Sequence, residues 1–153
     1  MLRELIKEGR FAIYDEPMGW EDAIRASVQP LVDHGDVTGE YADVIIEKVK
    51  QFGPYIVVAP DIALPHAQDS NHVLRSAACF VKFNHPVSFS EGTCEKADPE
   101  KTARLFFALS SEDEMKHLRN LRALTEECLK NRELIEKLGQ ASTKNEILEI
   151  LVE

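Results

Sequence analysis

The chain has 153 residues, of which 44% are hydrophobic and 29% are charged, and its formal net charge is −9 at pH 7. These values are typical of one soluble globular domain, which we expect to span residues 1–153. The negative charge and the lack of Lys and Arg clusters argue against a protein that binds nucleic acid through its phosphates.

The sequence shows no signal for membrane insertion or secretion. Its longest uninterrupted apolar run, Ile56 to Pro60, is far shorter than the roughly 20 residues that cross a bilayer, and its start lacks the apolar core of a signal peptide. We therefore expect a cytoplasmic protein. Cys79, Cys94 and Cys128 are too widely spaced for a disulfide framework or a zinc ribbon, so we expect reduced thiols.

Apolar residues recur at helical spacing in three segments of the first third of the chain, and a glycine stands where each helix would end. The predicted elements are a short helix from Leu2 to Gly9, a strand from Phe11 to Tyr14, a helix from Trp20 to Gly35, and a helix capped by Thr38 or Gly39 that ends at Phe52-Gly53-Pro54.

The rest of the chain predicts four strands and then three helices. The strands are Tyr55 to Ala59, Ile62 to Leu64, Leu74 to Phe83 and Arg104 to Leu109, and after Phe83 the run Asn84 to Phe89 continues as a loop into a strand-like alternation. The helices are one opened by a Ser111–Glu114 capping box, one from Asn131 to Leu138 that ends at Gly139, and one opened by a Thr143–Glu146 capping box. This alternation favours a three-layer α/β fold, or an α+β fold in three layers. We expect a mixed central sheet of about five strands flanked by helices on both faces.

His66 is the strongest candidate for chemistry among the five histidines. It follows an apolar strand and Pro65, which fixes the direction of the backbone, and it precedes the small Ala67. A neutral imidazole, with an ordinary pKa of about 6.5, is a competent nucleophile when its ring is held at a strand end. The same pattern also fits an ordinary loop histidine, so the residues alone leave both interpretations open.

The other histidines have structural interpretations. His117 shares a helix face with Leu121, Leu124 and Cys128, which is typical of a hydrogen-bonded histidine at the core edge. The remaining three are His34, at a helix C-terminus where the dipole favours a cation, and His72 and His85, in polar turns where we expect them to be solvated.

Metal binding has little support, because no pair of histidines has the spacing of metal ligands. His66, His72 and Asp69 could still meet in a loop, so a small metal-dependent enzyme stays an alternative hypothesis. Phosphate-binding, dinucleotide-binding and serine-hydrolase glycine motifs are also missing from the sequence. We therefore expect neither a metal nor a cofactor.

The run Ile62-Ala63-Leu64-Pro65-His66-Ala67 resembles the active-site motif of the EIIA components of the bacterial phosphoenolpyruvate-dependent sugar phosphotransferase system (PTS), in the mannitol/fructose superfamily. The longer run from Gly53 to Ala67 is most similar to the ascorbate-type branch. The resemblance covers nearly the whole chain, since it includes Tyr41 to Lys50, Pro86 to Phe89 and Leu105 to Leu124.

This resemblance implies a phosphotransferase that works through a phosphohistidine. His66 would accept a phosphoryl group from the carrier protein HPr and pass it to a cysteine of a cognate EIIB component, which serves a membrane permease, EIIC, for ascorbate or a related sugar. His117 matches the family's second histidine, which lies beside the first and supports the phosphoryl group. Lys48 matches an arginine of the mannitol branch that assists the phosphoryl group.

Asp61 departs from the family pattern, because family members usually have glycine five residues before the active histidine. Aspartate tolerates a left-handed backbone better than most residues, so we expect the turn to be kept. A carboxylate close to a phosphohistidine would repel it, which leads us to expect that Asp61 points away from His66.

A second function, of a different class, would use the same histidine. An EIIA-like regulatory module would control a transporter, a kinase or a transcription factor by its phosphorylation state, without feeding a sugar. The sequence does not separate the two functions, because both need His66.

Overall fold

Five strands form one mixed sheet in the computed structural model, which describes residues 2–68, 71–89, 101–113, 116, 119, 122–123, 126 and 130–151. The strands are β1 (Phe11–Tyr14), β2 (Val57–Ala59), β3 (Asp61–Ala63), β4 (Ala77–Ser88) and β5 (Thr102–Ser110), in the order β1-β4-β5-β3-β2. β1 is parallel to β4 and β3 is parallel to β5, whereas the β4–β5 and β2–β3 pairs are antiparallel. The predicted mixed sheet is confirmed.

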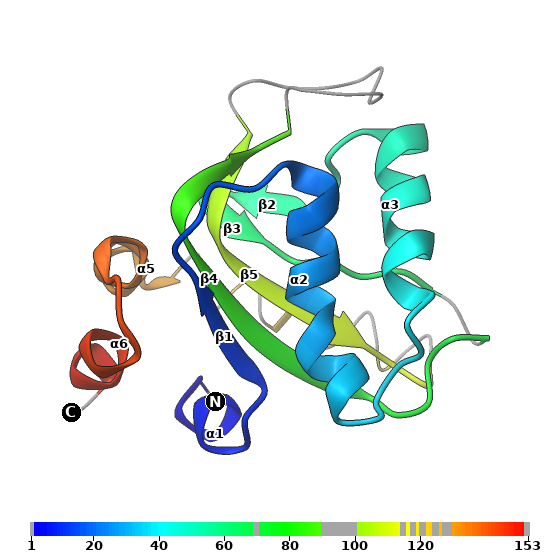
Figure 1. Cartoon of the computed structure of the whole chain (residues 1–153), viewed down its shortest axis with the longest axis horizontal. Helices are drawn as coiled ribbons and strands as arrows, with labels where there is room; N and C mark the ends of the chain where they lie inside the picture. Colours follow the sequence, from blue (N-terminus) through cyan, green and yellow to red (C-terminus); the bar gives the residue numbers. More distant parts are fainter. Residues whose placement is uncertain are drawn as a thin grey trace.

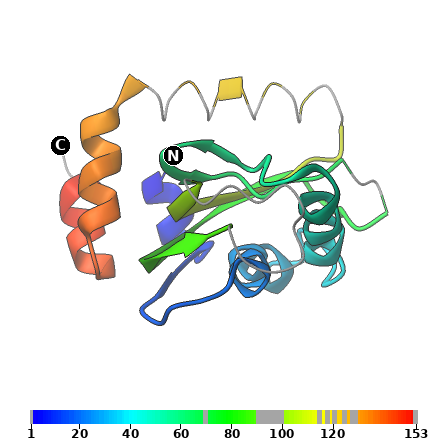
Figure 2. The ribbon, with the colours of Figure 1, turned by 90° about the horizontal axis from the view of Figure 1, so that it is seen from above.

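Helices cover both faces of this sheet and give the predicted three-layer α/β fold. α2 (Trp20–Asp33) and α3 (Tyr41–Phe52) share one hydrophobic core with the sheet, and α1 (Leu2–Lys7), α5 (Arg132–Gln140) and α6 (Lys144–Leu151) share another. Figures 1 and 2 show α2 and α3 side by side and well separated from α5 and α6. None of the described helices is long and apolar enough to cross a membrane.

The two cores explain the nearly continuous apolar run of β5, because successive residues of a strand point to opposite faces. Phe106 and Ala108 join the core with α2 and α3. Leu105, Phe107 and Leu109 join the core with α1, α5 and α6. β5, the central strand, is thus buried on both faces, and it pairs in parallel with β3, the strand that leads to His66.

β4 is longer than predicted, because it continues to Ser88. Its register against β5 shifts between Lys82 and Val87, so extra residues of β4 form a bulge there. A bulge accepts Pro86, which has no N–H to donate to the ladder. The loop predicted at the start of the run Asn84 to Phe89 is therefore part of the strand, and the strand-like alternation predicted after it is confirmed as far as Ser88.

Two strands begin later than predicted, because turns precede them. The N–H of Leu74 donates to the carbonyl of Asp36 at 2.8 Å, and β4 begins only at Ala77. In the same way, the turn after α3 delays the start of β2 from Tyr55 to Val57. Local sequence patterns indicated the strands but not these loop contacts.

Two helix ends also differ from the prediction. α3 begins after Glu40, which makes no side-chain capping bond, so the predicted cap at Thr38 or Gly39 was wrong. Gly139 lies inside α5, which runs to Gln140, and so it does not end the helix. The last predicted cap is confirmed, because Thr143 Oγ1 accepts the N–H of Glu146 at 3.2 Å.

The capping box predicted at Ser111 and Glu114 stays a prediction, because the structure describes only part of this helix start. Asp113 Oδ1 accepts the N–H of Lys116 at 3.3 Å, whereas Ser111 Oγ bonds to Asp113. Glu114, the other member of the predicted capping box, lies outside the described residues. Residues 116, 119, 122, 123, 126 and 130 are helical.

The sheet face below α5 carries an ion pair between Asp61 on β3 and Arg104 on β5. Asp61 Oδ2 accepts from Arg104 Nη2 at 2.6 Å and from Nε at 2.9 Å, and Oδ1 accepts the N–H of Arg104 at 3.0 Å. The carboxylate thereby raises the pKa of Arg104. Gly139 leaves room for the pair, because a Cβ at this position would stand 2.7 Å from Arg104 Nη2 and from Asp61 Oδ2.

Asp61 also has a left-handed backbone, with φ of 72°, and it is the one non-glycine residue with positive φ among those described. The expectation that aspartate keeps the glycine-like turn is therefore met. The strain of this conformation is small for aspartate, whose short side chain bonds locally.

Lys82 is a buried cation on β4, with 1% of its surface exposed. Its Nζ donates to Asn84 Oδ1 at 2.9 Å and to the carbonyl of Phe83 at 3.3 Å. Burial, together with the nearby charge of Arg104, lowers the pKa of Lys82 to about 8. A buried ammonium with so few partners reduces the stability of the folded state at neutral pH.

We expect the unfolding free energy to rise with pH between about 8 and 10 because of Lys82. The folded state releases the Lys82 proton near pH 8 and the unfolded state near 10.5, so between these values the unfolded state binds more protons and folding gains stability. The rise due to this group is roughly 1 to 3 kcal/mol. Urea unfolding of the natural protein and Lys82→Met at pH 7, 8, 9 and 10 measures it as the pH-dependent difference between the two. A difference that stays constant with pH would contradict the prediction.

We expect Asp61→Asn to lower the unfolding free energy by about 1 to 2 kcal/mol, because asparagine keeps the turn and loses the ion pair with the partly exposed Arg104. Chemical unfolding of Asp61→Asn, Arg104→Gln and the double variant measures the coupling directly. The double variant should lose less stability than the two single changes summed. Strict additivity would show that the pair contributes nothing.

Candidate functional site

His66 lies just beyond β3, where the chain runs along the end of β5. Leu64 donates its N–H to the carbonyl of Ile56 at 2.7 Å, and the N–H of Leu109 donates to the carbonyl of Pro65 at 3.0 Å. Leu64 and Pro65 are buried, whereas His66 is half-buried. A histidine at the edge of the core, on a backbone bonded to a central strand, is held firmly and stays accessible.

The ring of His66 is oriented by a hydrogen bond to its own chain. Nδ1 lies 2.5 Å from the carbonyl oxygen of Leu64. A carbonyl oxygen only accepts, so Nδ1 carries the proton and donates it. In the neutral imidazole the lone pair is then on Nε2, which makes Nε2 the nucleophilic atom.

Two tyrosine hydroxyls hold the backbone around this ring. Tyr55 Oη donates to the carbonyl of His66 at 2.5 Å, and its ring meets the imidazole edge-on with centroids 5.2 Å apart. The fully buried Tyr41 on α3 donates to the carbonyl of Leu109 at 2.7 Å and accepts the N–H of Ala67 at 3.1 Å.

The sequence patterns did not indicate Tyr41 or Tyr55 as site residues. A buried tyrosine hydroxyl needs a hydrogen-bond partner, and this need was the signal that could have marked them. This signal would not have identified the partners. Tyr41 bonds to Ala67, 26 residues away, and Tyr55 bonds to His66, 11 residues away.

The other predicted site residues are placed only in part. His117 lies outside the described residues, so its place beside His66 stays a prediction. Lys48 is half-buried on α3, seven residues after Tyr41 and thus on the same side of the helix, about 10 Å further along its axis. The part of the chain that the structure describes contains no ion pair of Lys48.

His34 and, in its exposure, His85 follow the predictions, whereas His72 is more buried than expected. His34 is the C-cap of α2, and its ring lies between the carbonyls of Pro30 and Glu8. His85 is exposed, whereas His72 is half-buried and its carbonyl accepts the N–H of Thr38. The described residues hold no group of three His, Cys, Asp or Glu side chains arranged as metal ligands, and Asp69 lies outside them.

Asp61 is directed away from His66, as expected. It bonds to Arg104 near the start of β5, whereas Pro65 bonds to Leu109 near the end of that strand. Five residues of strand separate the two contacts, which is about 16 Å and exceeds the Debye length of about 8 Å at physiological salt. Its charge is also compensated by Arg104, so it should disturb a phosphoryl group at His66 little.

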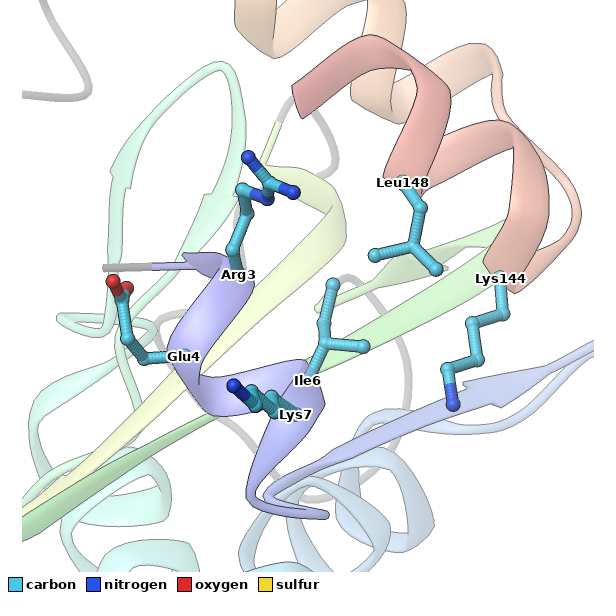
Figure 3. Close-up of a pocket in the computed structure, with 6 residues that line it drawn as sticks. All are labelled: Arg3, Glu4, Ile6, Lys7, Lys144 and Leu148. Carbon is cyan, nitrogen blue, oxygen red and sulfur yellow. The ribbon is translucent and has the colours of Figure 1, made fainter. Parts of the chain in front are cut away.

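A separate pocket lies between α1 and α6 (Figure 3). It is lined by Arg3, Glu4, Ile6, Lys7, Lys144 and Leu148. None of the predicted site residues lines this pocket, so the chemistry expected of His66 does not use it.

Comparisons with known proteins agree with the fold and with the family resemblance. The family model described as "Phosphoenolpyruvate-dependent sugar phosphotransferase system, EIIA 2" matches residues 4–153. The ascorbate-specific PTS system EIIA component of Escherichia coli K12 is 30% identical over 98 residues, which cover 63% of this chain and 64% of that protein.

Two solved structures are similar over almost the whole chain. The solution structure of the mannitol-specific cryptic phosphotransferase enzyme IIA from Escherichia coli is 25% identical, with a TM-score of 0.78 and coverage of 97% of this chain and 96% of that one. In a complex of mannitol enzyme IIA with phosphorylated mannitol enzyme IIB from Escherichia coli, the matching chain shares the fold at 24% identity, with a TM-score of 0.72 and coverage of 93% and 94%. The chain therefore belongs to the EIIA 2 family and is a phosphoryl carrier component of a sugar phosphotransferase system.

Proposed function

We propose that His66 is the phosphoryl acceptor and that the phosphoryl group is carried on Nε2. The observation that carries this proposal is the contact between Nδ1 of His66 and the carbonyl of Leu64, because it assigns the proton to Nδ1 and the lone pair to Nε2. The family membership of the chain supports the choice of histidine, since His66 stands in the run Ile62 to Ala67 that resembles the family's active-site motif.

The transfer consists of two displacements at phosphorus. The Nε2 lone pair of His66 attacks the phosphoryl group of phospho-HPr, the bond from phosphorus to HPr breaks, and its electron pair stays on HPr. In the second step a cysteine thiolate of EIIB attacks the same phosphorus, and the Nε2–P bond returns its electrons to the ring. Nδ1 keeps its proton in both steps, and its hydrogen bond to Leu64 stabilises the charged phosphoimidazole.

His117 and Lys48 are the proposed supports of the phosphoryl oxygens. His117 would donate from its ring, and Lys48 would contribute a positive charge from α3. Their roles differ in kind from that of His66, because neither forms a bond to phosphorus. We infer no metal or cofactor for this chemistry.

EIIB is the proposed acceptor, and a membrane permease, EIIC, the indirect partner. A structurally similar mannitol enzyme IIA forms a complex with its phosphorylated enzyme IIB, which supports an acceptor of that kind here. The proposed sugar is ascorbate or a related one, on the basis of 30% identity to an ascorbate-specific component. The donor and acceptor would meet the protein in the cytoplasm.

Incubation with phosphoenolpyruvate, Enzyme I and HPr should add one acid-labile phosphoryl group to the peptide that contains His66, with the modification on Nε2. His66→Ala should abolish it, because no other nucleophile occupies that position. His85→Ala, which changes an exposed histidine on β4, is the matched control and should be labelled normally. Peptide mass spectrometry and ³¹P–¹⁵N correlation NMR provide the two readouts. Label on another residue, or none on the natural protein, would refute the proposed function.

His117→Ala should still be phosphorylated at His66 but should pass the group to EIIB about tenfold to a hundredfold more slowly, because a phosphoryl-stabilising donor is lost. Lys48→Met should give a smaller decrease of the same kind. Rapid-quench measurement of phosphoryl loss from phospho-His66 on mixing with EIIB provides the rates. Unchanged transfer by His117→Ala would assign this residue to packing alone.

A further inference from the structure

Tyr55 makes two different contacts with His66, one to the backbone and one to the ring. Its hydroxyl donates to the carbonyl of His66 at 2.5 Å, and its ring stands at 84° to the imidazole with 5.2 Å between centroids. Burial raises the pKa of Tyr55 above its ordinary value, so its hydroxyl stays protonated and remains a donor at every physiological pH.

The position of Tyr55 is itself fixed by the turn that ends α3. Gly53 has a φ of 86°, and the N–H of Tyr55 donates to the Gly53 carbonyl at 2.7 Å. Beyond it, Ile56 is fully buried and accepts the N–H of Leu64 at 2.7 Å. The phenol therefore reaches His66 from a rigid segment that is also bonded to the chain just before His66.

The edge-on ring contact restricts rotation of the imidazole. A half-turn about the bond between Cβ and Cγ would exchange Nδ1 with Cδ2 and Nε2 with Cε1. The hydrogen bond to Leu64 would then be lost, and a carbon atom would replace the nucleophile. A neighbouring ring packed edge-on disfavours such a turn, because protein interiors leave little free volume for it.

We propose that Tyr55 is a positioning residue for phosphoryl transfer: its hydroxyl holds the His66 backbone and its ring keeps Nδ1–H on the Leu64 carbonyl, so that Nε2 stays presented as the nucleophile. This inference rests on the proposed role of His66 and adds a residue that acts through it. Tyr55 forms no bond to phosphorus. Its two contacts are separable by mutation, because phenylalanine keeps the ring and leucine keeps neither.

The first test uses the unphosphorylated protein and does not depend on the proposed function. The ¹⁵N NMR spectrum of the His66 imidazole in the natural protein should show Nδ1–H as the dominant neutral tautomer. Tyr55→Phe should keep that tautomer, whereas Tyr55→Leu should show a clear population with the proton on Nε2. Tyr14→Leu is the matched control, because it removes a tyrosine of β1 that stacks on Phe83 of β4, and it should leave His66 unchanged.

The second test measures the rate of phosphorylation by phospho-HPr. Tyr55→Phe should slow it by about threefold and Tyr55→Leu by about tenfold or more, because small errors in the position of a nucleophile are costly in rate. Tyr14→Leu should react like the natural protein. A Tyr55→Leu protein that folds with an unaltered His66 tautomer and rate would overturn the proposal, as would a Tyr55→Phe protein whose tautomer changes fully. Absence of phosphorylation in the natural protein would refute the proposed function instead, and the spectra would still decide the role of Tyr55.

Discussion

The hydrogen bond from His66 Nδ1 to the carbonyl of Leu64 is the interaction on which the site depends. The two residues are only two positions apart in the chain. The bond nevertheless depends on the Leu64 backbone, which is held in place on both sides. Ile56 binds the Leu64 N–H, and Leu109 binds the next carbonyl, that of Pro65. The sheet therefore supplies a stationary acceptor, and the acceptor selects the tautomer of the ring.

The two hydrophobic cores have different relations to this site. The core beneath α2 and α3 includes Tyr41, whose hydroxyl joins the end of β5 to the residue after His66. The face beneath α5 instead carries Asp61, Arg104 and Lys82, in a charged group near the opposite end of β5. This charged group and His66 lie at opposite ends of β5. The protein can therefore keep a carboxylate five residues before His66 without placing that charge beside a phosphoryl group.

Asp61 shows how a departure from a family pattern can be accommodated. The position needs a left-handed backbone, which glycine adopts freely and aspartate adopts at small cost. The added side chain then needs a partner, which Arg104 provides, and the space for that pair exists because Gly139 has no side chain. Two residues distant in the chain thus compensate for one departure from the family pattern five residues before His66.

The sequence by itself determined the order of helices and strands, because periodicity and turn residues act locally, and its resemblance to a known family pointed to His66. Only the tertiary structure decided which hydroxyls hold His66, where the Asp61 carboxylate goes and that Pro86 lies in a bulge. These features join segments 11 to 68 residues apart, and they depend on β5 lying between β4 and β3. Local patterns predict a strand without its neighbours, and the neighbours decide which backbone atoms and side chains meet.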